Sequence, residues 1–187
     1  MSGVRIAAWQ HVEGRRGFEV ARIQALADGW RVDGHSTGED EGLAWGMHYE
    51  LHVDGAWATR SLRASGFSED GPWSLELEAD GAGSWSVDGA SSPAFDGCLD
   101  VDLVCTVFTN TLAVRRLGLE IEGSGSLDAV WIDTPAGREV QRVPQRYTRL
   151  GLRTYLFEVV GGDFSSELEI DEFGLVVRYP GLAQRVA

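Results

Sequence analysis

Lysine is absent from this chain of 187 residues, so its 16 basic residues are all arginines. Without a lysine amine, the chain can form neither a Schiff base nor a Walker-type phosphate loop. Acidic residues outnumber the arginines, and 29 Asp and Glu residues set the formal net charge at −13. A field of this sign repels nucleic-acid phosphates and anionic membrane surfaces. We therefore expect no nucleic-acid partner.

Cysteine and long apolar runs are also scarce. Cys98 and Cys105 are an odd number of residues apart on one predicted strand, so their side chains would point to opposite faces. We predict two buried thiols rather than a disulfide. Residues 1–10 lack the continuous apolar core of a signal peptide, and no later segment is long enough to span a bilayer. The sequence thus predicts a cytoplasmic protein without integral membrane association.

Histidine spacing argues against a metal site. His48 and His52 share one face of a predicted strand but lie about 13 Å apart along it, too far for one zinc ion. His11 and His35 fall in predicted turns or loops. Residues 34–38 read Gly-His-Ser-Thr-Gly, but the adjacency of His35 and Ser36 in the sequence does not make a catalytic dyad. We therefore predict no metal site and no cofactor.

Short apolar runs between glycine-rich breaks are what the chain does contain. Its 24 glycines and 7 tryptophans favour strands over helices. A chain of this length suits one domain, residues 1–187, that buries roughly 70% of its unfolded surface. Residues 43–53 and 57–64 form the clearest predicted hairpin, with its turn at Asp54-Gly55. The other predicted strands cover residues 18–24, 30–32, 73–78, 84–87, 127–132, 145–150, 154–160, 166–170 and 175–179, with a polar loop over 33–42.

The hairpin around Asp54 resembles the last hairpin, which turns at Asp171. In each, an apolar-x-apolar-Asp pattern precedes an aromatic residue, Trp57 in one and Phe173 in the other. Two related halves would produce this likeness, and so would the ordinary turn chemistry of unrelated hairpins.

The most distinctive segment covers residues 96–117. Between residues 97 and 105, apolar side chains alternate with Asp100, Asp102 and neighbouring residues, which predicts a half-buried strand with its acids on one face. Threonine and asparagine residues predict a polar turn next, and a short helical or irregular segment then carries Arg115 and Arg116. We interpret this segment as a polar recognition surface.

Asp100 and Asp102 have two interpretations. They lie about 6.6 Å apart along the predicted strand, a separation that overlaps the carboxylate spacing of inverting glycosidases. Neighbours on one strand point the same way, however, and cannot easily flank a bond from opposite sides. Ion pairing with Arg115, Arg116 or Arg60, or simple solvation, is therefore the favoured interpretation.

The arginines are the stronger binding candidates. Arg60, Arg115, Arg116 and Arg146 are flanked by apolar or aromatic residues, and a guanidinium offers planar, bidentate donors to phosphate, carboxylate or sugar hydroxyls. In so acidic a chain each one can instead neutralise a neighbouring carboxylate. We expect at least one to contact the polar end of a ligand, with aromatic residues of a concave sheet along its apolar part.

Several ordered motifs resemble those of a bacterial family known as putative glycolipid-binding, formerly a domain of unknown function. The resemblance extends over about residues 19–181. It implies an all-β fold, in which a strongly curved antiparallel sheet forms an open or incomplete barrel with at most short helices. The motifs lie at residues 35–38, 49, 60–61, 96–103, 106, 108–112, 115–117, 145–148, 171, 174–176 and 179–181.

The resemblance and the residues together predict a non-catalytic binding or carrier protein for an amphipathic ligand, a glycolipid or related lipid-linked sugar. The alternatives are a carbohydrate- or glycolipid-processing enzyme that uses carboxylates near Asp100 and Asp102, and a protein-interaction scaffold. The candidate ligand-binding residues are Arg60, Arg115, Arg116, Arg146, Tyr147, Asn110, Asp100 and Asp102.

Overall fold

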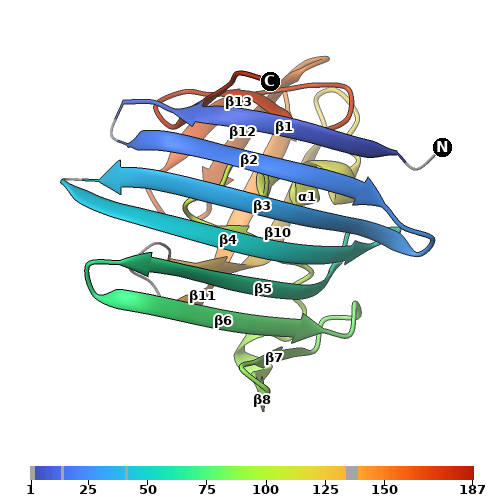
Figure 1. Ribbon diagram of the computed structural model, residues 1–187. Helices are drawn as coiled ribbons and strands as arrows, with labels where there is room; N and C mark the ends of the chain where they lie inside the picture. The colour runs from blue at the N-terminus through green and yellow to red at the C-terminus, as the bar shows by residue number, and fades with distance from the viewer. Residues whose placement is uncertain (1–2, 14, 41, 134–138) are drawn as a thin grey trace.

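The computed structural model describes residues 3–13, 15–40, 42–133 and 139–187. Six long strands form the face nearest the viewer in Figure 1: β1 (Val4–His11), β2 (Arg16–Ala25), β3 (Gly29–Asp40), β4 (Leu43–Asp54), β5 (Thr59–Ser68) and β6 (Gly71–Ala79). Next come β7 (Trp85–Val87), β8 (Ala90–Ser91), the 3-10 helix η1 (Pro93–Phe95), β9 (Asp100–Leu103) and the helix α1 (Asn110–Leu117). The chain ends with β10 (Ser124–Ile132), β11 (Val140–Arg149), β12 (Thr154–Val159), β13 (Ser165–Ile170), β14 (Val176–Tyr179) and β15 (Ala183–Arg185).

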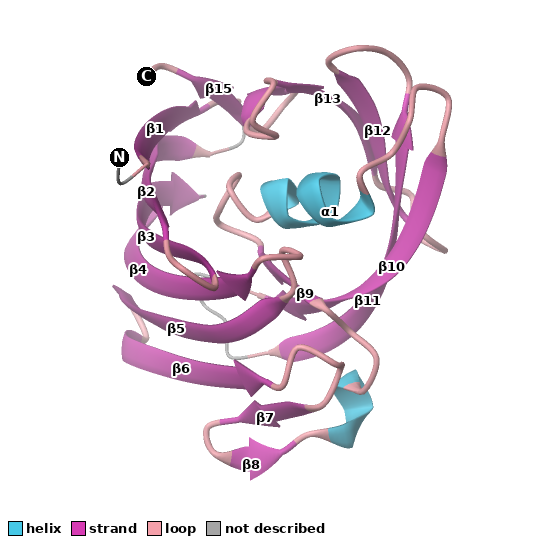
Figure 2. Cartoon of the chain, turned by 90° about the vertical axis from the view of Figure 1, so that its right-hand side faces the viewer, coloured by secondary structure: helices cyan, strands magenta, loops and turns pink. Residues whose placement is uncertain are grey.

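All described strands belong to one 15-stranded sheet that curves around α1 (Figure 2). Strands next to each other in the chain pair antiparallel from β1 to β8 and from β10 to β15, and β1 joins β15. The sheet ends at β8 and β9, which do not pair with each other in the described part of the chain, so the barrel is open. The predicted all-β, strongly curved open barrel is confirmed. One pairing departs from the antiparallel expectation, because β9 runs parallel to β10.

The polar loop predicted over residues 33–42 is wrong for residues 33–40, which belong to β3. Residues 33–39 pair with both β2 and β4, and Asp40 pairs with β4. Burial alternates along β3, as it does in any half-buried strand. Two of the buried positions are Gly34 and Ser36, and the residues beside them are polar, so the sequence of β3 lacks the alternation of apolar and polar residues that marks a strand. Gly34 is required there, because a Cβ would lie 2.0 Å from Cζ of Tyr49. The histidine placements need the same correction: His35 lies on β3 and His11 on β1.

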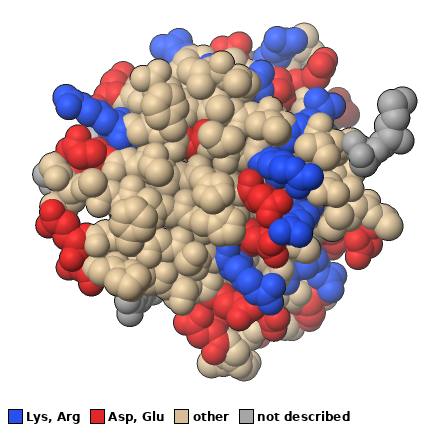
Figure 3. All heavy atoms as spheres, in the orientation of Figure 1, with Lys and Arg blue, Asp and Glu red and all other residues tan. Residues whose placement is uncertain are grey.

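The outer side of the front strands faces solvent. Figure 3 shows a broad uncharged area there, with charged side chains gathered toward one side and around the rim. Phe18, Val20 and Phe67 are among the exposed apolar residues, with 51%, 43% and 62% of their surface accessible. Cross-strand ion pairs, such as Arg63 with Glu76, contribute to the charged part. Because the outer face of β1–β6 is exposed to solvent, the core is built by the side chains that point to the inner face of these strands.

Helix α1 lies inside the curve of the sheet (Figure 2). Phe108 and Leu112 are fully buried, and they fill the interior together with inward-facing strand residues such as Trp9 and Leu62. The helix ends at Gly118, whose φ of 54° is the left-handed conformation that glycine adopts without strain. Arg115 and Arg116 occupy the last turn, where cations interact favourably with the helix dipole. The sequence predicts a helical or irregular segment with two arginines after a polar turn, and the structure shows that this segment is a short helix.

The strand predicted over residues 97–105 is shorter than expected, because β9 covers only four residues. Cys98 and Cys105 both lie outside β9, which removes the alternation argument for them. Both are nevertheless buried thiols that form no disulfide, as predicted. The described part of the chain contains no helix with the length and hydropathy that crossing a bilayer requires.

Candidate functional site

A cavity of about 770 Å³ opens at the end of the barrel where α1 finishes. We call it the arginine cavity, because Arg115 and Arg116 of α1, Arg149 of β11 and Arg153 of the β11–β12 turn all line it. Its walls also come from the β4–β5 and β13–β14 turns. The remaining lining residues are Gly55, Ala56, Trp57, Val114, Gly118, Leu152, Tyr155, Ile170, Asp171, Glu172, Phe173 and Gly174.

The two resembling hairpin turns meet at this cavity. The Asp54 carboxylate accepts hydrogen bonds from the backbone N–H groups of Ala56 and Ala58, at 2.9 and 3.0 Å. The Asp171 carboxylate accepts equivalent bonds two and four residues further on, both at 2.9 Å. These local bonds hold each turn in one conformation. As a result Trp57 and Phe173 come together, with ring centroids 5.9 Å apart.

Arg115 lies against these two aromatic rings. Its guanidinium carbon is 4.8 Å from the ring centroids of both Trp57 and Phe173, and Nη1 donates to the Phe173 carbonyl at 3.0 Å. Among the described residues no carboxylate pairs with it. Burial lowers the pKa of Arg115, and repulsion from Arg5 lowers it further. Arg115 is therefore a partly desolvated cation without a counter-ion among the residues that the structure describes.

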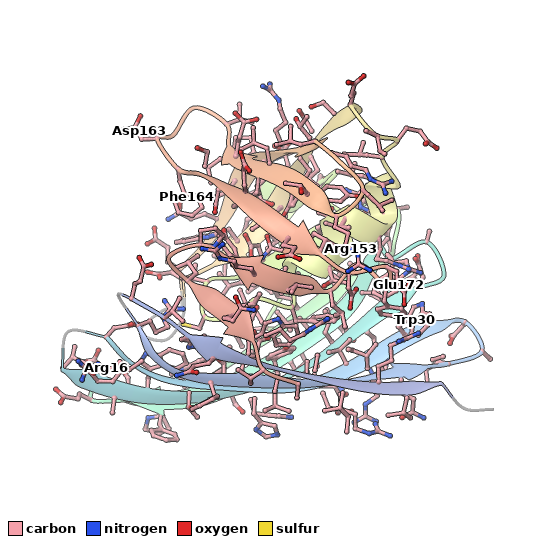
Figure 4. All side chains as sticks on the ribbon, turned by 90° about the horizontal axis from the view of Figure 1, so that it is seen from above. Arg16, Trp30, Arg153, Asp163, Phe164 and Glu172 are labelled. Carbon is pink, nitrogen blue, oxygen red and sulfur yellow. The ribbon has the colours of Figure 1, made fainter. Side chains whose placement is uncertain are left out.

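Arg149 and Arg153 add further positive charge. Arg149 donates to the carbonyls of Leu119, Leu152 and Gly151, at 2.8, 3.1 and 3.2 Å, and these bonds fix its position. Arg153 is exposed and makes no side-chain hydrogen bond or ion pair within the described ranges. Figure 4 shows Arg153 and Glu172 near each other at this end of the molecule. Neither arginine pairs with a described carboxylate.

Arg116, the fourth arginine of the cavity, and the Asp171 carboxylate each form an ion pair. Arg116 forms a bidentate ion pair with Asp100 of β9, with Nε 3.1 and 3.0 Å from the two carboxylate oxygens. Desolvation raises the pKa of Asp100, and Arg116 opposes this shift. Asp171 pairs with Arg185 at 2.5 Å. Within the described ranges, the cavity therefore holds three guanidiniums without a carboxylate partner and one exposed carboxylate, that of Glu172.

The remaining predicted acid and its neighbours fasten α1 to the sheet. Asp102 accepts hydrogen bonds from Gln145 Nε2 at 2.6 Å and Thr109 Oγ1 at 3.0 Å. Tyr147 donates its hydroxyl to the Asn110 side-chain carbonyl at 2.9 Å, and both residues are buried. Asp100 and Asp102 both contact the α1 segment, so they share a face of β9 as predicted. Asp100 is held there by Arg116, the ion pairing that the sequence favoured.

Arg60 and Arg146 lie elsewhere. Arg60 is exposed on β5, 3.8 Å from Asp54 Oδ2, and Arg146 is exposed on β11, where Nε contacts Ser126 Oγ at 3.5 Å. Neither lines the arginine cavity. On β11 the side chains alternate, so Tyr147 points inward and Arg146 points outward. The structure thus brings Arg115 and Arg116 together but places Arg60 and Arg146 outside their cavity.

Sequence reasoning missed Arg149, Arg153, Trp57 and Phe173 as parts of a site. The likeness of the two hairpins was a usable signal for Trp57 and Phe173, because equivalent turns place equivalent aromatics. Two arginines on either side of the 150–152 turn were a weaker signal for Arg149 and Arg153. The described residues contain no cluster of three or more His, Cys, Asp or Glu side chains able to hold a metal ion.

Comparison with known proteins gives consistent results. A solved structure of a DUF1089-family protein from Pseudomonas aeruginosa is 38% identical to this chain and covers 95% of both chains, with a TM-score of 0.80. Curated proteins gave no significant match. The sequence profile of the family described as "Putative glycolipid-binding" matches residues 6–185. The match covers nearly the whole chain, and the chain therefore belongs to this glycolipid-binding family.

Proposed function

We propose that this protein binds and carries an amphipathic small molecule, a glycolipid or related lipid-linked sugar, whose polar head is anionic and sits in the arginine cavity. The observation that carries the proposal is the charge of that cavity. Arg115, Arg149 and Arg153 line it without a described carboxylate partner, although the chain as a whole has a formal net charge of −13. A chain rich in acids could have neutralised these arginines, and an anionic ligand would do so instead.

The chemistry of the lining supports both ends of such a ligand. Hydrogen bonds from a guanidinium to an anion are roughly twice as strong as neutral ones, and planar guanidiniums suit phosphate and carboxylate oxygens. An anion would also screen the repulsion between Arg115 and Arg5 that acts in the unliganded protein. Trp57, Phe173 and Leu152 provide apolar and aromatic surface beside these cations for the rest of the molecule.

Two lipids that differ only in head-group charge provide the test. A uronic-acid-headed glycolipid and the corresponding glucose-headed lipid, with the same acyl chains, would be titrated into the protein and detected by native mass spectrometry. We expect the anionic lipid to bind at least tenfold more tightly, as loss of one charge-assisted contact costs about 1.5–3 kcal/mol. Equal binding of both lipids contradicts the head-group assignment, and no binding of either contradicts the carrier function.

Matched arginine variants locate the head group. Arg153→Gln changes an exposed side chain, so the fold should be kept, and we expect it to weaken binding of the anionic lipid about tenfold. Arg146→Gln removes an equally exposed arginine on β11 outside the cavity and should leave binding unchanged. Thermal melts verify that both variants are folded. If the two variants bind the anionic lipid equally, the arginine cavity is not the head-group site.

A further inference from the structure

A second cavity lies at the opposite end of α1. Its volume is about 350 Å³, and it is reached by Asn110 in the first turn of the helix, whereas Arg115 and Arg116 in the last turn reach the arginine cavity. Figure 4 shows Phe164, which lines the second cavity, on the other side of the molecule from Arg153. No described residue lines both cavities. We call the second one the aspartate cavity, because Asp102 lies in its lining.

Asp102 brings a buried carboxyl group to the lining of this cavity. Its two oxygens accept one hydrogen bond each, from Gln145 and Thr109. An ionised carboxylate has about four acceptor sites, so capacity remains for a ligand. Desolvation is the main cause that raises the pKa of Asp102, and nearby Asp100 raises it further. A cation at this position would offset both effects.

The nearby arginines are committed to other acceptors. Arg116 pairs with Asp100, and Arg15, which also lines the aspartate cavity, places Nε 3.2 Å from both oxygens of Asp40. Nη1 of Arg15 donates to the Val104 carbonyl at 3.1 Å. Among the described residues, Asp102 therefore has no ion-pair partner within 4.0 Å. A desolvated carboxylate that lacks a counter-ion is costly for a protein to keep.

Aromatic rings surround the approach to Asp102. Phe164 stands 6.0 Å from the Phe157 ring and 6.4 Å from the Tyr179 ring, measured between centroids, and Trp131 also lines the cavity. Phe164 keeps 45% of its surface exposed, so a large apolar ring remains accessible at this cavity. Aromatic faces attract a cation through the ring quadrupole, and they stabilise the apolar groups attached to it.

We infer that the aspartate cavity is a second binding site, specific for a protonated organic amine with an apolar substituent. The ammonium group would bind Asp102 and lie within the aromatic lining, and the substituent would contact Phe157 and Phe164. The inference does not depend on the ligand of the arginine cavity, because the two sites share no lining residue in the described part of the chain. A neutral alcohol of the same shape could fill the space but could not neutralise the carboxylate.

The test compares cyclohexylmethylamine with cyclohexylmethanol, which have similar shapes and differ in charge at neutral pH. Both would be titrated into the full chain and followed by calorimetry and by ligand-observed NMR. We expect saturable binding of the amine and at least tenfold weaker binding of the alcohol. Equal affinity for the two compounds, or no binding of the amine, overturns the inference.

Variants place the amine. Asp102→Asn keeps the size of the side chain and removes its charge, so the amine should lose its advantage over the alcohol. Asp128→Asn is the matched control, because Asp128 pairs with Arg142 on the exposed side of β10, and it should bind the amine as the parent does. If Asp102→Asn does not fold, Phe164→Ala replaces it as the test, because the Phe164 ring is exposed. We expect this variant to bind the amine severalfold more weakly than the parent. If folded Asp102→Asn or folded Phe164→Ala binds the amine as tightly as the parent does, the assignment is wrong. Arg153→Gln, which changes the other cavity, must leave amine binding unchanged.

Discussion

Glu19 makes a pH-dependent contribution to stability that can be measured directly. This carboxylate lies on β2 and is fully buried inside the barrel. It accepts hydrogen bonds from the backbone N–H groups of Val107 and Phe108, at 2.5 and 3.4 Å, and from the Tyr49 hydroxyl at 2.8 Å. Glu19 thus ties the segment just before α1 to the front of the sheet. The perturbation we consider is Glu19→Gln, which removes the charge but keeps the size.

Burial sets the magnitude and the sign of the effect. Desolvation raises the pKa of Glu19 from 4.5 to about 7, although the three hydrogen bonds oppose the shift. The folded protein therefore holds a proton that the unfolded chain releases. Stability from this group is complete below the unfolded pKa of 4.5 and is lost as pH rises toward 7. The rise of the Glu19 pKa from 4.5 to about 7 corresponds to about 3 kcal/mol of unfolding free energy.

Urea unfolding followed by tryptophan fluorescence, from about pH 5 to about pH 8, measures this loss. The parent should lose about 2.5 kcal/mol relative to Glu19→Gln across that range, because part of the full effect lies below pH 5. Glu19→Gln also loses a hydrogen-bond acceptor, which lowers its unfolding free energy by the same amount at every pH. The pH dependence of the difference in unfolding free energy therefore reports only the effect of the Glu19 charge. Glu167→Gln, at an exposed position on β13, serves as the control and should follow the parent.

His11 acts in the opposite direction, which is why the comparison uses variants. Burial is the main cause that lowers the pKa of His11 from 6.5 to about 4. Because its folded pKa is depressed, stability from His11 is lost as pH falls from 6.5 toward 4. This contribution is common to the parent and Glu19→Gln and cancels in their difference. A difference between the two proteins that stays constant from about pH 5 to about pH 8 would refute the reasoning for Glu19.

Three further predictions follow from single contacts. Gly34→Ala places a Cβ 2.0 Å from Tyr49 Cζ and should lower the unfolding free energy in urea by at least about 2 kcal/mol, whereas Gly55→Ala, with no atom within 4 Å, should be nearly neutral. Arg116→Gln strands buried Asp100 and should cost about 3–5 kcal/mol by the same measurement, with partial recovery in the double variant that adds Asp100→Asn; no recovery would contradict ion pairing as the cause. Thiol titration should detect Cys98 and Cys105 only after unfolding, and rapid reaction of the folded protein would contradict their burial.

Local patterns were sufficient for much of the fold. Hairpin residues on either side of Asp54 and Asp171 form antiparallel pairs as predicted, because an Asp-Gly or Asp-x-x-Gly turn between alternating runs is a short-range signal. The shortcomings have local causes too. The sequence predicts a loop over most of β3, since Gly34 and Ser36 occupy inward positions where the apolar side chains of a half-buried strand are expected. Residue 34 must be glycine because the ring of Tyr49, on the neighbouring strand β4, occupies the space that a Cβ would fill. The local sequence of β3 contains no information about which side chain of β4 lies there.

The sequence by itself determined the strand-rich class, the two hairpins, a helical or irregular segment that carries Arg115 and Arg116, and the family motifs. Each depends on residues close together in the chain. Only the tertiary structure decided which arginines share a cavity, because β11 alternation turns Arg146 outward while the β11–β12 turn brings Arg153 to the end of α1. It likewise decided that Asp100 has a counter-ion and Asp102 has none among the described residues. Charge pairing depends on distance in space, and folding brings together groups as far apart in sequence as Glu19 and Val107.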